Sequence, residues 1–110
     1  MKTYITLFLW SIFIANAQSA IASDAIYCPA GQVKHIQSQN NNVIIYIDDL
    51  GWKAIGNYSS PSTQTRLSLA LYAQASGDNL LLAFPLNSGV ICSESNYHIE
   101  PIKVRLSKKK

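Results

Sequence analysis

From Ser60 to Cys92 the chain reads SPSTQTRLSLALYAQASGDNLLLAFPLNSGVIC, and this stretch decides the fold. Its first half predicts one helix, because Pro61 or Ser62 is a typical start and Gly77 a typical end. The apolar run Leu80 to Phe84 follows at once and predicts a buried strand. The segments on either side then supply the other strands of a sheet on which this helix packs.

Three strands are expected before the helix. Gln32 to Gln37 is the first, and its broken alternation of apolar residues predicts a bulge. Val43 to Ile47 is almost wholly β-branched or aromatic and is the clearest strand of the chain. The polar residues Ser38 to Asn42 between them tolerate left-handed turns, so the two strands form an antiparallel hairpin. Trp52 to Asn57 or Tyr58 is the third strand, where Gly56 indicates a bend or a close backbone approach.

The last strand is expected over Tyr97 to Leu106, with Pro101 indicating an edge position or a bulge. The elements then run as three strands, a helix and two strands. A five-stranded Greek-key barrel has this order, with its helix between strands 3 and 4. An open antiparallel sheet that carries one helix is the alternative. Either way the predicted fold class is mainly β with one helix.

Residues 1–22 are predicted to be a secretory signal peptide. Lys2 supplies a positive charge, Tyr4 to Ala15 is apolar, and small residues offer cleavage sites after Ala17 to Ala22. A membrane anchor is the alternative, which the short apolar run and the lack of a following positive cluster disfavour. Cleavage leaves one domain over residues 23–110, small enough for its core to be marginal by itself. We therefore expect a secreted or periplasmic protein.

The chain has two cysteines, Cys28 and Cys92, and such a pair in an exported protein predicts one disulfide. Closing a loop of this length stabilises a domain by about 4 kcal/mol in the chain-entropy treatment. The two histidines, His35 and His98, are too few for a convincing metal site, and the chain lacks a Cys-x-x-Cys motif. We therefore expect neither a metal nor another cofactor.

The formal net charge of +3 is concentrated toward the C-terminus. Lys103, Arg105 and the final three lysines carry most of it, so the body of the domain is close to neutral. A basic surface for nucleic acid is therefore not indicated. Lys108 to Lys110 are interpreted as a solvated basic tail.

No catalytic motif is visible in the sequence, and we expect no enzyme. The adjacent carboxylates Asp48 and Asp49 lie in a predicted turn, where turn chemistry explains them. A Ser-His-Asp triad is a spatial arrangement that leaves no signature in one sequence, so that possibility stays open.

The predicted helix is apolar on two sides. Its first face has the spacing i, i+3, i+4 and i+8 and consists of Leu67, Ala70, Leu71 and Ala75. Leu69, Tyr72 and Ala73 lie roughly opposite, and a helix of this kind usually packs against two partners. The second partner is either a neighbouring subunit, with these three residues at the interface, or the partly covered rim of the same domain.

Side chains suited to carbohydrate lie in or beside the predicted loops. Aromatic faces stack on sugar rings, and Asn, Ser and Asp form hydrogen bonds with hydroxyl groups. Three loops offer such polar groups: Ser38–Asn42, Asn57–Ser62 and Asn87–Gly89. Trp52, Tyr58 and Ser59 are the candidate glycan-binding residues. For Trp52, packing within the sheet is the competing explanation.

Several features together resemble a known family. They are the signal peptide, Cys28, the hairpin around Val43–Ile47, the helix Ser62–Ser76, the run Gly77–Leu82, Cys92 and the strand Tyr97–Leu106. In this order they resemble the small cell-binding B subunits of AB5 bacterial toxins, which have an OB-like barrel. The similarity covers nearly the whole mature domain and is greatest to the subtilase-cytotoxin, pertussis-like and type II enterotoxin B subunits.

The resemblance implies a non-enzymatic protein whose five copies form a ring with the helices around its centre. Such a ring binds glycans on host-cell surfaces and carries a separate catalytic A subunit. No sugar-contacting residue is carried over, because the receptor loops share no motif with this chain. An alternative from another class is a small secreted or periplasmic inhibitor or accessory protein of a partner enzyme, which the small size and single disulfide also fit.

Overall fold

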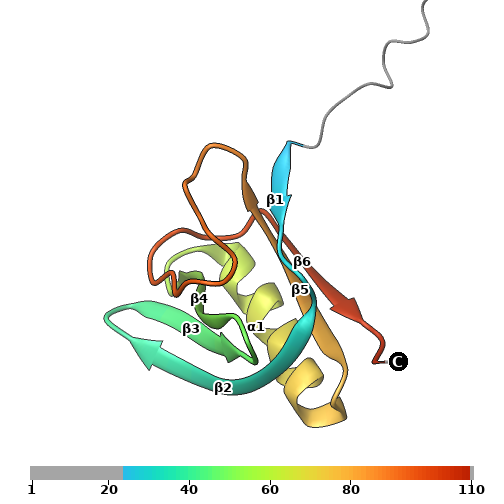
Figure 1. The fold of residues 1–110 in the computed structure, drawn as a ribbon. Helices are drawn as coiled ribbons and strands as arrows, with labels where there is room; N and C mark the ends of the chain where they lie inside the picture. The colour runs from blue at the N-terminus through green and yellow to red at the C-terminus, as the bar shows by residue number, and fades with distance from the viewer. Residues whose placement is uncertain (1–23, 110) are drawn as a thin grey trace, which may run out of the picture.

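A computed structural model gives the fold of residues 24–109 (Figure 1). These residues form six strands and one helix. The bounds are Ala25–Tyr27 (β1), Gly31–Gln39 (β2), Asn42–Ile47 (β3), Gly51–Asn57 (β4), Pro61–Ser76 (α1), Asn79–Pro85 (β5) and Lys103–Ser107 (β6). The prediction of a mainly β domain with one helix is confirmed. The predicted signal peptide, residues 1–22, lies outside the described residues.

The strands form one antiparallel sheet in the order β1-β5-β2-β3-β4, with β6 paired to the opposite edge of β5. β2 is long and curved: its first residues pair with β5 and the rest pair with β3 (Figure 1). Five strands were expected, with the helix after the third. The helix instead follows the fourth strand, because Ala25–Tyr27 pairs with residues 83–85 and forms an additional strand.

Within residues 24–109 the sheet is not closed into a barrel by a continuous ladder of strand pairs. The free edge of β4 bonds instead to the segment before β6, through a single parallel bridge between Lys53 and Asn96. The Ala54 N–H donates to the Asn96 carbonyl at 2.8 Å, and the Asn96 N–H donates to the Trp52 carbonyl at 2.8 Å. The last strand is therefore shorter than predicted, since residues 97–102 lie outside any strand.

The turns of the β2–β3–β4 meander follow from local sequence signals. Asn40 and Asn41 have φ angles of 49° and 69°, so a two-residue left-handed turn joins β2 to β3. The predicted bulge in β2 is confirmed by a register shift between Val33 and His35. Asp49, in the β3–β4 turn, also has a left-handed φ of 68°, which fits the turn role expected for the carboxylate pair.

The helix begins and ends where the sequence predicts. Pro61 occupies its first turn, where a missing N–H costs no hydrogen bond. Gly77 ends it in the left-handed conformation, with φ 80° and its N–H donating to the Ala73 carbonyl at 3.0 Å. The close approach predicted at Gly56 is also confirmed: a Cβ there would lie 2.0 Å from the Thr63 hydroxyl oxygen.

The inner face of α1 carries small side chains. Its buried residues are Thr63, Ala70 and Ala73, and two leucines, Leu67 and Leu69, pack partly buried against the core. Leu71 is 49% exposed and Ala75 is also exposed, so their prediction as core-facing residues is wrong. Ala73, predicted on the outer side, is buried. The close contact of Thr63 with Gly56 explains this rotation, because Ala70 and Ala73 follow Thr63 by seven and ten residues and therefore lie on the same face of the helix.

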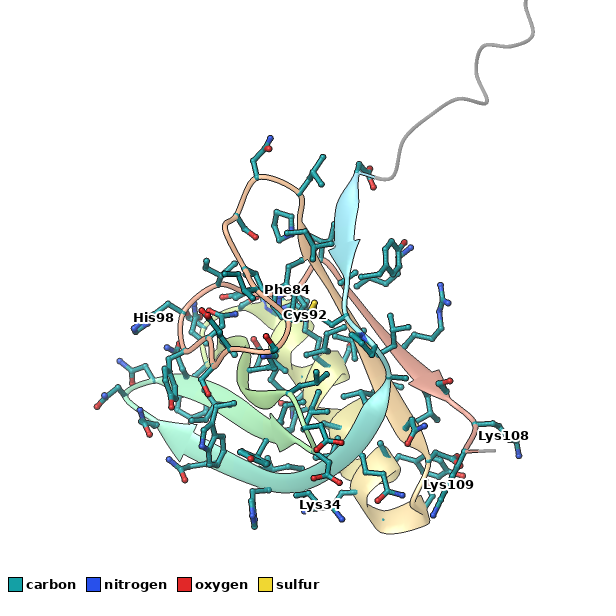
Figure 2. All side chains as sticks on the ribbon, viewed as in Figure 1. Lys34, Phe84, Cys92, His98, Lys108 and Lys109 are labelled. Carbon is teal, nitrogen blue, oxygen red and sulfur yellow. A yellow bond between two sulfur atoms is a disulfide. The ribbon has the colours of Figure 1, made fainter. Side chains whose placement is uncertain are left out.

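The core lies between α1 and the inner face of the sheet. Its most buried side chains include Ile45, Ile47, Ile55, Leu80, Leu82 and Phe84. The predicted disulfide between Cys28 and Cys92 is confirmed, with an S–S distance of 2.05 Å. Phe84 and Cys92 are labelled in Figure 2: Phe84 is buried in the core, and Cys92 packs partly buried against it. The bond thus ties the connection between β1 and β2 to the long connection between β5 and β6.

One charged side chain lies inside the core. Lys53 has an exposed fraction of 0% and projects from β4 between the sheet and the β5–β6 connection. Its Nζ donates to the carbonyl of Leu50 at 2.7 Å and to the carbonyl of Glu94 at 2.6 Å. These bonds satisfy the buried ammonium group and hold the β3–β4 turn against the segment around Glu94.

Replacing Lys53 by Met is expected to flatten the alkaline pH dependence of stability. Burial lowers the pKa of Lys53 below its ordinary 10.5, and the nearby Glu94 carboxylate offsets part of this effect. The unfolded chain then binds more protons than the folded one, so the unfolding free energy rises with pH until about 10.5. Urea unfolding at several alkaline pH values measures the slope, with exposed Lys34→Met as control. Equal slopes for Lys53→Met and the unsubstituted protein would contradict this account.

Candidate functional site

The turn between β4 and α1 brings two of the candidate residues, Tyr58 and Ser59, against the tip of the β2–β3 hairpin. The Tyr58 N–H donates to the Asn41 carbonyl at 2.9 Å. The Tyr58 hydroxyl also forms a hydrogen bond with the Ser38 hydroxyl. Two of the three polar loops named from the sequence, those that begin at Ser38 and Asn57, therefore lie together.

Asn57 fixes the shape of this turn. Its side-chain carbonyl accepts hydrogen bonds from the Ser59 N–H at 3.0 Å and from the Ser59 hydroxyl at 2.7 Å. Its Nδ2 donates to Glu100 Oε2 at 3.3 Å, and its backbone carbonyl accepts from the Thr63 hydroxyl at 2.7 Å. Asparagine favours turns because its side chain can bond to the backbone two residues on. Two hydrogen bonds to the Asn57 side chain therefore define the position of Ser59, while the bonds to Glu100 and Thr63 hold Asn57 itself in place.

An ion pair between Arg66 and Glu100 stabilises the turn, because Glu100 also bonds to Asn57. Arg66 Nη1 lies 3.1 Å from Glu100 Oε1, with both side chains partly buried. The same nitrogen donates to the Ile55 carbonyl at 2.8 Å. Arg66 is the single charged residue of α1, so these contacts direct the charge of the helix inward toward β4 and Glu100. The first turn of the helix is thereby fixed relative to Asn57.

Two hollows adjoin at Tyr58 and Ser59. The first has a volume of about 330 Å³, lies beside the start of α1, and is lined by residues that include Ser60, Gln64 and Leu67. The second has a volume of about 560 Å³ and is lined by Asn41, Asn42, Asn57, Tyr58 and Ser59. Every described residue that lines either hollow is uncharged. Tyr58 is 56% exposed and forms the wall between the two spaces.

The chemistry of these hollows is that of neutral hydrogen bonding. Hydroxyl and amide groups donate and accept hydrogen bonds without ionising, and the tyrosine ring adds an apolar face. Their volumes lie within the range of small-molecule sites. Over residues 24–109, moreover, no group of three or more His, Cys, Asp or Glu side chains lies close enough to hold a metal ion. The site can therefore bind a neutral, hydroxyl-rich molecule.

Trp52 lies apart from Tyr58 and Ser59. It is the second residue of β4, whereas Asn57 is the last, and the Trp52 backbone N–H donates to the Ser95 hydroxyl at 3.1 Å. Its ring contacts the Tyr46 ring edge-on, with centroids 5.3 Å apart, and His35 lies beside it. The three candidate glycan-binding residues thus fall into two separate places on the domain.

The candidate interface residues do not share one surface. Ala73 is buried, Leu69 packs partly against the core, and Tyr72 is 56% exposed. Tyr72 lies instead beside Leu71, which is 49% exposed, on the outward face of α1. Of the three predicted residues, Tyr72 is thus the one with a large exposed side chain.

Other residues at the site, among them Asn41, Ser38 and Gln64, were not singled out from the sequence as binding residues. Asn41 and Ser38 belong to a polar loop that was named, but its contact with Tyr58 depends on the β2–β3 register. Gln64 enters the first hollow because Pro61 sets the start of the helix one turn earlier. The third named loop, Asn87–Gly89, lines neither hollow.

Comparison with protein-family models, with curated proteins and with solved structures finds no match to this chain. In the part of the chain that the structure describes, no helix has the length and apolar character needed to cross a membrane. The disulfide points to a location outside the cytoplasm, because such bonds persist in oxidising compartments.

Proposed function

We propose that this protein is a secreted or periplasmic carbohydrate-binding protein of the toxin B-subunit type, without catalytic activity of its own. The observation that carries the proposal is the pair of uncharged hollows at Tyr58 and Ser59. Their amide and hydroxyl groups match the hydroxyl groups of a sugar, and the exposed tyrosine ring offers an apolar face to its C–H groups. Host cell-surface glycans are the proposed ligands.

An OB-like barrel is the finer description of the fold that we propose. Two features support it. β2 pairs with β5 at one end and with β3 at the other, which bends the sheet around the core. The bridge from Lys53 to Asn96 then joins the free edge of β4 to the segment that leads into β6.

The outward face of α1 supports a homo-oligomer. Leu71 and Tyr72 are about half exposed there, and the helix directs its one charge, on Arg66, toward Glu100. Exposed apolar patches without charge are typical of contact surfaces between subunits. We propose a pentamer in which these helices surround the centre of the ring, and a separate catalytic A subunit that the ring carries.

A glycan array tests the binding proposal. We expect the protein to bind a subset of cell-surface glycans. Tyr58→Ala should weaken that binding at least about tenfold, because the loss of the tyrosine ring and its hydrogen bonds costs about 1.4 kcal/mol or more of binding free energy. Tyr27→Ala is the matched control, because Tyr27 is 45% exposed but lies on β1. Ser59→Ala should weaken binding without loss of the fold.

Light scattering on the same samples measures the oligomer. A monomeric mass together with an array that shows no bound glycan would refute the proposal. Recovery of a one-to-one complex with a partner enzyme in a pull-down would favour the inhibitor alternative instead.

A further inference from the structure

Three aromatic rings from three neighbouring strands meet on the outer face of the sheet. His35 of β2 is in register with Tyr46 of β3, and Tyr46 is in register with Trp52 of β4. Side chains alternate between the two faces of a strand, and the neighbours of Tyr46, Ile45 and Ile47, belong to the core. The three rings, here called the ring cluster, therefore lie on the face away from α1.

The ring cluster is compact. The centroids of Tyr46 and Trp52 are 5.3 Å apart, those of His35 and Tyr46 5.8 Å, and those of His35 and Trp52 6.2 Å. These three distances describe a nearly equilateral triangle, although His35 and Trp52 are separated by a whole strand. The outer two rings lean together over Tyr46, with the planes of His35 and Trp52 inclined by 29°. The side chains thus form one aromatic patch.

The patch is accessible, and polar side chains lie beside it. His35 is exposed, and Tyr46 and Trp52 are partly exposed. On the same face of β2, the Gln37 amide donates to the Gln39 amide oxygen at 2.7 Å. The Ser95 hydroxyl lies against the backbone of Trp52. Amide and hydroxyl groups therefore border the rings.

We propose that the ring cluster is a second carbohydrate subsite, which stacks on the apolar face of one sugar ring of a neutral oligosaccharide. A sugar ring has C–H groups on one face and hydroxyl groups around its rim. The aromatic patch complements the C–H face of the sugar, and the bordering amide and hydroxyl groups complement its hydroxyl groups. The choice of carbohydrate as the ligand class rests on the proposed function.

A protein partner fits this face less well. A stable protein interface buries about 800 Å² on each side around an apolar centre. The large exposed apolar side chains of the described residues come from β1, α1, the loops and the segment before β6, and none comes from β2, β3 or β4. The ring cluster is therefore an isolated aromatic patch of the size of a sugar ring, set in polar surroundings.

The position of the ring cluster relates it to the hollows at Tyr58. Asn42 lines the second hollow and lies on β3 four residues before Tyr46, so alternation places both on one face of that strand. At about 3.3 Å per residue the two positions are about 13 Å apart. Ile44 lies between them on this face and is buried, so a glycan that contacts both sites has to span a covered stretch of surface, whereas a single sugar unit contacts only one site.

Tryptophan fluorescence tests this subsite directly. Trp52 is the only tryptophan among residues 24–109, and Trp10→Phe removes the other one in the chain. In that background, the soluble form of the printed oligosaccharide with the strongest array signal is titrated against the emission of Trp52, beside its own terminal monosaccharide. We expect the oligosaccharide to shift the emission and the monosaccharide to leave it unchanged.

Variants separate the two proposals. We expect Trp52→Leu to weaken oligosaccharide binding about tenfold and His35→Ala about threefold, with Tyr27→Ala unchanged and all three proteins folded by circular dichroism. If Trp52→Leu binds normally and the emission stays constant while Tyr58→Ala loses binding, the ring-cluster proposal is overturned and the proposed function stands. If the unsubstituted protein binds no printed oligosaccharide, both are overturned.

Discussion

Replacing Cys28 and Cys92 together by alanine is expected to lower the free energy of unfolding by about 4 kcal/mol. The disulfide joins residues 64 positions apart, and a loop of this length restricts the unfolded chain strongly. Cys28 is 2% exposed, so alanine avoids the further cost of burying a hydroxyl group. Since small domains are stable by only about 5–15 kcal/mol in total, a large part of the stability of this domain depends on the bond.

Urea unfolding at 25 °C, followed by circular dichroism, measures the effect. The unsubstituted protein in the presence of a reducing agent is the matched control and should unfold at the same midpoint as the double variant. A double variant within about 0.5 kcal/mol of the oxidised protein would contradict the prediction, because that is the size of an ordinary surface substitution.

Replacing Gly56 by alanine is expected to cost about 3 kcal/mol. Two effects add. The φ angle of Gly56 is 151°, which side chains rarely adopt. The new Cβ would also lie 2.0 Å from the Thr63 hydroxyl oxygen and 3.1 Å from the Thr63 Cβ, so α1 would have to move away from β4. That movement would disturb the hydrogen bond from Thr63 to Asn57 and with it the turn at Ser59.

Gly89→Ala separates the two effects. Gly89 also has a positive φ, of 82°, but a Cβ there meets nothing within 4 Å. It should therefore cost only about 1 kcal/mol, from backbone strain alone. The double variant Gly56→Ala with Thr63→Ala should recover part of the loss, because it removes the nearest atom. Thermal or urea unfolding measures the stability of these three variants and of the unsubstituted protein. Equal losses at Gly56 and Gly89 would show that the close helix contact carries no energy.

The parts of the fold that depend on local signals were predictable from the sequence. Pro61 and Gly77 mark the helix because each suits one backbone position at its ends. The strand Ala25–Tyr27 was missed because three residues carry no periodic pattern and their pairing depends on residues 83–85. The faces of α1 were assigned wrongly because spacing alone grouped Leu71 and Ala75 with Leu67 and Ala70, whereas the contact of Thr63 with Gly56 turns Ala73 inward.

The candidate site was predictable in its residue types and not in its geometry. Tyr58 and Ser59 were named for their chemistry, and the hollows lie at these residues. Trp52 was grouped with them, but the length of β4 separates them. Its partners His35 and Tyr46 come from two other strands, and only the register of the sheet brings the three rings together.

The disulfide also sets the order in which the chain can mature. A chain that enters an oxidising compartment with its N-terminus first presents Cys28 long before Cys92, which follows 64 residues later. β1 likewise cannot pair until β5 is present, because its partner residues lie in β5. In such a chain the cross-link and the first strand pair therefore form only after most of the domain has entered the compartment.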